Sequence, residues 1–126
     1  LASSYVERLT GERYTLDILG INKGVALINN NGERLELKFW SSGLADQVYL
    51  ALRLALAKVF SYQVESLPII LDDILVRFDE NRQRSALELL AELGKNQQIW
   101  LFTCQRSVYD MAQSIMGIDC HRLSRS

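Results

Sequence analysis

The stretch from residue 45 to residue 71 constrains the fold of this chain more than any other part. Ala45–Gln63 is apolar on nearly every side of a helical projection, which indicates a long buried helix. Leu67–Leu71 follows it, a short apolar run with Pro68 at its start, which is typical of a strand buried in a parallel sheet. A buried helix that leads into a buried strand favours an α/β fold.

The remainder of the chain repeats this alternation. Asn81–Leu93 is amphipathic and predicts a helix, with Gly94 as its stop. Residues 98–103 form a second apolar run that predicts a buried strand, 107–116 predicts a helix, and 118–123 predicts a last strand. Strand, helix, strand and helix in this order indicate βαβ units with a parallel sheet.

The first 39 residues have a different pattern. Leu1, Tyr5 and Leu9 recur at helical spacing and predict the end of a helix near Gly11. Apolar and polar residues then alternate, and turn-forming residues separate the segments. We therefore expect a three-stranded antiparallel meander over roughly 13–39.

Composition limits the classes of function. The chain has 126 residues, 48% of them hydrophobic and 23% charged, which indicates one globular domain and excludes disorder. The net charge of -1 gives no support for nucleic-acid binding through bulk charge. Arg53 and Lys58 interrupt the most apolar run, so no membrane partner is expected. Two cysteines make no disulfide framework, which favours the cytoplasm. The chain does not begin with Met, and we expect it to be a piece of a longer protein.

Ser41, Ser42 and Gly43 stand directly before the long helix. A helix N-terminus offers unpaired N–H groups, and small residues let a phosphate approach them. Serine is also a preferred N-cap, and on this segment alone the capping role is favoured.

Asp72 and Asp73 end the predicted strand 67–71, at the edge of an α/β sheet where ligands usually bind. Adjacent like charges are costly there without a cation. A magnesium ion held by Asp72, with Asp73 facing an attacking water, would resolve this. A polar loop after a strand explains the same residues, and the two interpretations are evenly balanced.

Thr103, Cys104 and Gln105 end the next predicted strand. In a parallel sheet they lie near Asp73, where a polar side chain could contact a phosphate or a water. Taken alone, this segment is better explained as an ordinary loop.

Four segments follow one another in the order and spacing of a known set of motifs. Trp40–Gln47 resembles the ABC signature, and its continuation to Ala55 resembles the SMC-like branch. Ile69–Asp73 resembles Walker B, Val76–Asp79 resembles the D-loop, and Phe102–Gln105 resembles the switch segment. The chain thus resembles the C-terminal lobe of an SMC/RecN/YhaN-like ABC-type ATPase head.

The resemblance implies an α/β fold that is the C-terminal half of a P-loop ATPase head, with an antiparallel meander followed by βαβ units and a parallel sheet. It divides the chain into the end of a coiled coil over 1–11 and the lobe itself over 12–126. A P-loop would read G-x-x-x-x-G-K-[ST], and the chain has no such run. The resemblance therefore implies that the lobe is inactive alone and needs the N-terminal lobe of the same head.

In this family, two heads enclose two ATP molecules, and the signature of one head faces the nucleotide of the other. The resemblance implies that Ser41, Ser42, Gly43 and Gln47 form the part that contacts ATP. Of these, Ser42 and Gly43 would contact the γ-phosphate bound to a partner head. Ser42 replaces the usual first glycine of the signature pair, a change that many SMC-like relatives tolerate.

The resemblance further implies that Asp72 holds Mg²⁺ through water, that Asp73 is the general base, and that Asp79 organises the interface between heads. Asp73 stands where most ABC proteins carry Glu, and Gln105 replaces the switch His. Glutamine can donate a hydrogen bond to the γ-phosphate but carries no proton to transfer. Slow turnover, or a head used as an ATP-gated clamp, is consistent with this change.

The resulting hypothesis is an ATPase head that hydrolyses ATP at the interface of a homodimer of heads, in DNA repair or chromosome maintenance. Duplex DNA as a partner rests on the resemblance alone. Two alternatives stay open: a structural head that dimerises with ATP without hydrolysis, and the nucleotide domain of an ABC transporter. The meander before the signature fits the transporter less well.

Overall fold

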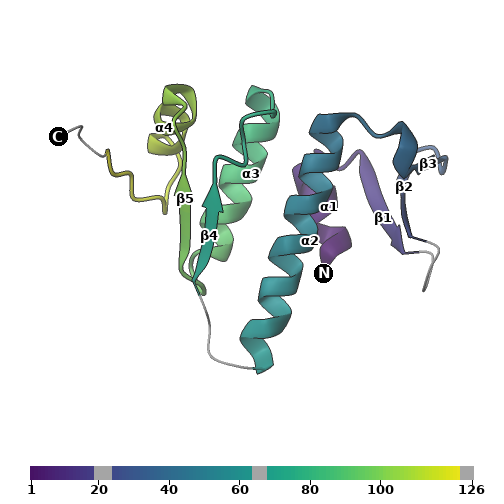
Figure 1. Ribbon diagram of the computed structural model, residues 1–126, viewed down its shortest axis with the longest axis horizontal. Helices are drawn as coiled ribbons and strands as arrows, with labels where there is room; N and C mark the ends of the chain where they lie inside the picture. The colour runs from purple at the N-terminus through teal and green to yellow at the C-terminus, as the bar shows by residue number, and fades with distance from the viewer. Residues whose placement is uncertain (19–23, 64–67, 123–126) are drawn as a thin grey trace.

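The computed structural model describes residues 1–18, 24–63 and 68–122. Its elements, in chain order, are α1 (Ala2–Leu9), β1 (Tyr14–Ile18), β2 (Val25–Asn29), β3 (Arg34–Glu36), the 3-10 helix η1 (Leu37–Phe39), α2 (Ser42–Gln63), β4 (Ile69–Asp72), α3 (Glu80–Leu93), β5 (Ile99–Phe102) and α4 (Arg106–Gln113). Strands β1, β2 and β3 form an antiparallel sheet, and β4 and β5 form a parallel one. Figure 1 shows α2 standing between the two sheets. The predicted α/β fold, with a meander followed by a parallel sheet, is confirmed.

The meander forms largely as the alternation predicts. In β1, Tyr14 pairs with Asn29, and the central strand β2 also pairs with β3, where Ile28 lies opposite Arg34. Helix α1 ends at Leu9 as predicted, and Gly11 follows with a φ of +64°, which glycine adopts without a steric penalty. The predicted turn at 22–24 falls mostly outside the described residues.

The third strand is shorter than predicted. Residues 37–39 form η1 rather than strand, and Leu37 and Phe39 are exposed. Their alternation therefore has no core behind it that would hold the strand straight. Trp40 closes the turn, because its Nε1 donates a hydrogen bond of 3.0 Å to the carbonyl oxygen of Leu35. The chain can then leave the sheet and enter α2.

Helix α2 begins at Ser42, three residues before the predicted start, because Ser41 caps it. The backbone N–H of Leu44 donates to Ser41 Oγ over 3.1 Å. The prediction that the helix is buried on nearly every side is wrong for this chain. One face is buried in the core, whereas the other leaves four large side chains exposed, namely Tyr49, Leu56, Val59 and Phe60.

The parallel pair also has one open face. Ile69 lies opposite Ile99, and Asp72 lies opposite Phe102. Alternate side chains of β4 are buried and exposed, which differs from the fully buried strands predicted here. The exposed apolar side chains of this face are Ile70, Trp100 and Phe102. Residue 67, the predicted first residue of β4, lies outside the described residues.

Helix α3 matches its prediction closely, and Asp79 is its N-cap. Gly94 ends the helix as the C-cap, with a right-handed φ of -65° rather than a left-handed stop. Helix α4 ends at Gln113, earlier than predicted, because Ser114 Oγ donates to the carbonyl oxygen of Met111 and closes the last turn. The predicted strand at 118–123 is wrong over 118–122, and residue 123 lies outside the described part.

A single apolar core runs through both halves of the chain. It includes side chains from all four α-helices and from β2 and β4, among them Val6, Leu27, Leu54, Leu71 and Leu87. Among the described residues, no helix has both the length and the apolar character needed to cross a membrane.

Candidate functional site

The carboxyl ends of β4 and β5 bring Asp73 against the switch segment. The N–H of Asp73 donates to the carbonyl oxygen of Phe102 over 2.7 Å, which continues the pairing of the two strands by one residue. Thr103 Oγ1 donates to Asp73 Oδ1 over 3.5 Å, and Cys104 Sγ donates to Asp73 Oδ2 over 3.6 Å. The predicted proximity of Asp73 to this segment is therefore confirmed.

Asp73 also has an unusual backbone. Its φ is +51°, in the left-handed region that non-glycine residues rarely adopt and that costs about 1–2 kcal/mol. The backbone bond to Phe102 and the two side-chain contacts hold Asp73 in this conformation. Such outliers persist where the surrounding structure fixes them, and they cluster at functional sites.

Asp72 is the neighbouring carboxylate and it is exposed. Within residues 1–18, 24–63 and 68–122, no three histidine, cysteine or acidic side chains come together as a complete metal site. Mg²⁺ usually keeps several waters and takes one or two carboxylates plus phosphate oxygens. Asp72 fits this requirement as a single ligand, with the remaining positions left to water and nucleotide.

Gln105 lies at the N-cap position of α4, and its N–H donates to Thr103 Oγ1 over 3.1 Å. Its side chain accepts a hydrogen bond of 3.4 Å from Nε2 of Gln83 on α3. The sequence analysis did not single out Gln83. Its spacing from Ala86 and Leu87 sets it on the apolar face of α3, and a polar residue on such a face is the signal that could have found it.

At the start of α2, the structure shows the capping contact of Ser41, and both Ser41 and Ser42 are exposed. Gly43 is buried. A Cβ atom built on it would collide with Nη1 of Arg82 and lie 3.6 Å from the carbonyl oxygen of Arg77. A side chain at this position would displace the Arg82 guanidinium, whereas the Arg77 carbonyl lies at ordinary van der Waals distance.

The turn at Ser41–Gly43, here called the signature turn after the motif it resembles, therefore lies beside Arg77, in the segment that resembles the D-loop. It is at the end of the molecule where β4 and β5 also finish (Figure 1). Arg77 Nε lies 3.7 Å from Asp46 Oδ2. Asp79 Oδ1 accepts a hydrogen bond of 2.8 Å from the N–H of Arg82, whose guanidinium reaches Gly43. Arg82 is thus a link between the two motifs that the sequence analysis did not find.

Gln47 lies apart from the other candidate residues. Its side chain is only 1% exposed, and its Nε2 donates to the carbonyl oxygen of Leu9 at the end of α1. The contact ties α1 to α2. A contact between Gln47 and a nucleotide would require this side chain to turn outward.

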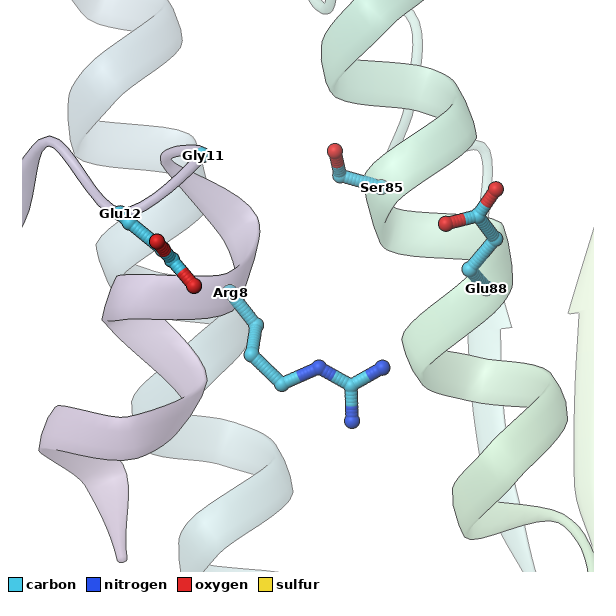
Figure 2. A pocket seen from close by; sticks show the side chains of 5 residues that line it. All are labelled: Arg8, Gly11, Glu12, Ser85 and Glu88. Carbon is cyan, nitrogen blue, oxygen red and sulfur yellow. The ribbon is translucent and has the colours of Figure 1, made fainter.

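A shallow hollow of about 300 Å³ lies elsewhere, between the end of α1 and α3. Figure 2 shows Arg8 extending from α1 toward α3, where Ser85 and Glu88 form the other wall. Arg8 forms an ion pair with Glu92 of α3. None of the sequence-predicted site residues lines this hollow.

Solved structures of SMC heads share this fold. The SMC head domain from Thermotoga maritima matches with a TM-score of 0.68 and 20% identity, over 88% of this chain and 38% of that one. An SMC ATPase solved for a study of ATP-driven dimerisation and DNA-stimulated activation matches with a TM-score of 0.69 and 16% identity. That match covers 95% of this chain and 77% of that one. The fold is that of a lobe of an SMC-like ATPase head.

The sequence is also similar to a curated protein. The uncharacterized protein YhaN of Bacillus subtilis (strain 168) is 33% identical over 116 residues, which is 90% of this chain and 12% of that protein. No family model matches the sequence. The chain therefore has the fold of an SMC head lobe and is similar in sequence to YhaN, and it spans about an eighth of the length of that relative.

Proposed function

We propose that this chain is the C-terminal part of an SMC-like ATPase head that binds and hydrolyses ATP at an interface between two heads. One observation carries the proposal. Parallel pairing of β4 and β5 brings Asp73 into contact with Thr103 and Cys104, directly before Gln105. An acidic residue beside polar switch residues at this edge of a sheet is suited to positioning a water for attack on phosphate.

Asp73, Gln105 and Asp72, at this edge of the parallel sheet, have different roles in the proposed reaction. Asp73 accepts a hydrogen bond from the attacking water and orients it. Gln105 donates from its side-chain amide to the γ-phosphate oxygens, a task that needs no change in protonation. Asp72 holds Mg²⁺ through water. When bound, Mg²⁺ neutralises charge that develops on the phosphate oxygens.

The signature turn serves the second head. Ser41, Ser42 and Gly43 stand at the N-terminus of a 22-residue helix, where free N–H groups favour a phosphate. Asp79 caps α3 beside this turn and is exposed, so it can also meet a partner head. In this proposal the partner is a second copy of the same head, and Gln47 holds α2 against α1.

The N-terminal lobe of the same head completes the site. The chain carries no Walker A run, so the phosphate cradle must come from that lobe, and this lobe alone is inactive. The exposed apolar side chains of the parallel pair support such a cover, since parallel sheets are normally covered on both faces. Residues 1–11 would be the end of a coiled coil and 12–126 the lobe.

DNA repair or chromosome maintenance in the cytoplasm, with duplex DNA as partner, is the setting we propose. Support comes from the study of DNA-stimulated activation of SMC ATPases that describes one structural neighbour. The net charge of -1 contributes none. If the complete protein binds duplex DNA, its affinity should fall as salt rises.

The first test measures phosphate release from the complete two-lobed protein, with and without duplex DNA. Asp73→Asn should lower the rate by about 100-fold or more, because the variant keeps the shape but loses the acceptor strength of the carboxylate. It should leave ATP-driven dimerisation intact. Asp17→Asn, in the meander sheet, is the matched control and should keep the wild-type rate.

Equal rates for Asp73→Asn and the wild type would refute the role of Asp73. Dimerisation with ATP and no phosphate release from either protein would favour a structural head, an alternative that the Gln at position 105 supports. Co-purification with a membrane subunit would point instead to a transporter nucleotide domain.

A further inference from the structure

Gln83 is a buried polar side chain next to the candidate site. It lies on α3, is 6% exposed, and is surrounded by the apolar core. Its Nε2 donates two hydrogen bonds, one to the carbonyl oxygen of Leu75 over 3.2 Å and one to Gln105 Oε1 over 3.4 Å. Both N–H groups of this amide are therefore used, and they join the loop after β4 to the switch segment.

Chemistry fixes the orientation of the Gln83 amide. A backbone carbonyl can only accept a hydrogen bond, so the group of Gln83 that faces Leu75 must be the NH₂. A flipped amide would set two oxygens against each other in a buried place, which is strongly unfavourable. Because Leu75 is main chain, it cannot rotate to relieve that contact.

The orientation of Gln83 in turn fixes that of Gln105. Since Gln83 presents a donor, Gln105 must present its acceptor Oε1 in return. Its Nε2 then lies on the other branch of the amide, and among the described residues it makes no hydrogen bond. The main chain of Gln105 is held by Thr103 Oγ1, whose hydroxyl donates to Asp73.

We propose that Gln83 is a positioning residue. It holds the Gln105 amide so that the NH₂ group, and not the oxygen, faces the γ-phosphate. This inference rests on the proposed function, since it concerns the phosphate contact of Gln105. An amide that rotates freely presents its oxygen as readily as its NH₂, and an oxygen repels phosphate. Because Gln83 is buried and its donor is fixed, it allows only one orientation of the Gln105 amide. A protonated histidine at the switch position would need no such partner, since both of its ring nitrogens donate.

The test uses two variants of the complete two-lobed protein. Gln83→Met has a similar length and no hydrogen-bonding group, so it frees the Gln105 amide and should lower the rate of phosphate release by about 2- to 10-fold. Gln83→Glu has the same shape, and its buried carboxyl must carry a proton that it donates to the Leu75 carbonyl. Only an acceptor is then left for Gln105, so the NH₂ of Gln105 should turn toward residue 83 and its oxygen toward the phosphate. The expected loss is larger, up to about 100-fold.

The same two changes are then made in a Gln105→Ala background. If Gln83 acts through Gln105, neither change should lower the remaining rate further, and the effects should be clearly non-additive. Losses of the same factor in both backgrounds would mean that Gln83 only stabilises the fold, and this would overturn the proposal. Thermal unfolding of each variant identifies any that do not fold.

A readout independent of activity separates this proposal from the proposed function. In the nucleotide-free protein with ¹⁵N-labelled glutamine, the Gln105 NH₂ protons should exchange fast with water in the wild type and slowly in Gln83→Glu. Protection already present in the wild type would overturn the inference, even if Asp73 proves essential. A wild type without ATPase activity would refute the proposed function, while the exchange result would still decide the orientation of Gln105.

Discussion

The two sheets of this molecule differ in how complete they are. In the meander, β2 is paired on both sides, and its residues Ala26 and Leu27 are buried, one on each face of the sheet. In the parallel pair, β4 and β5 have no further strand beside them among the described residues, and Trp100 and Phe102 are 46% and 45% exposed. An antiparallel sheet can leave one face in water, whereas a parallel sheet is normally covered on both faces.

Among the described residues, the parallel pair therefore leaves an apolar sheet face uncovered. Helix α1 packs on β1, and Leu9 and Leu27 of this half are buried in the core. The parallel half carries the candidate catalytic residues Asp72, Asp73 and Gln105 on a two-stranded sheet, which is marginal by itself. In the function that we propose, the chemistry would lie on the region that the N-terminal lobe completes.

The largest expected effect tests whether the two regions share one core. Leu27 and Leu71 are both fully buried and belong to one apolar cluster. Leu71→Ala and Leu27→Ala should each lower the free energy of unfolding of the 126-residue chain by about 2–5 kcal/mol. Urea unfolding followed by circular dichroism and by tryptophan fluorescence measures both.

Coincident transitions for the two probes are expected in both variants, because the cluster is continuous. Two separate transitions, with Leu27→Ala shifting only one of them, would show that the meander folds independently of the parallel half.

A smaller effect concerns one side-chain cap in each region. Asp79→Ala removes the acceptor for the N–H of Arg82 at the start of α3 and should cost about 1 kcal/mol. Asn29 Oδ1 accepts from the N–H groups of Asn31 and Glu33 in the β2–β3 turn, so Asn29→Ala is the counterpart. Thermal unfolding of the chain measures both losses.

In the complete protein, only Asp79→Ala should also weaken ATP-driven dimerisation. Equal dimerisation by the two variants would limit Asp79 to its role as a helix cap.

The smallest expected effect on the stability of the chain tests most directly whether the exposed face of the parallel pair is covered in the two-lobed protein. Trp100→Ser and Phe102→Ser replace exposed side chains of the open face, so each should change the stability of the 126-residue chain by no more than about 0.5 kcal/mol. The same changes in the two-lobed protein should be clearly destabilising if that face is covered there. Equal small effects in both proteins would show that the face stays open.

Much of the fold follows from local pattern. The alternation in β1 and β2 and the amphipathic spacing of α3 each depend on a few neighbouring residues, so they predict the elements correctly. The limits of the third strand and of α4 were mispredicted because each depends on a single side-chain to backbone hydrogen bond that the apolar pattern does not report. The Trp40 indole on Leu35 stops one, and the Ser114 hydroxyl on Met111 stops the other.

The candidate site shows the same division. Parallel pairing was predictable, and with it the approach of Asp73 to Thr103. Gln83 and Arg82 were missed, because a polar residue in a helix shows no partner in the sequence. Gln47 was assigned to the nucleotide by its place after the signature, and only the packing of α1 on α2 reveals its bond to Leu9.

The sequence by itself determined the order of the elements, the absence of a Walker A run in these 126 residues, and the acids at the end of the fourth strand. These properties depend on residue type and spacing along the chain. Only the tertiary structure decided which faces stay open, that Gly43 lies under Arg82, and that Gln83 faces Gln105. Those contacts join residues 22 to 39 positions apart, and they form only when the helices and strands pack against one another.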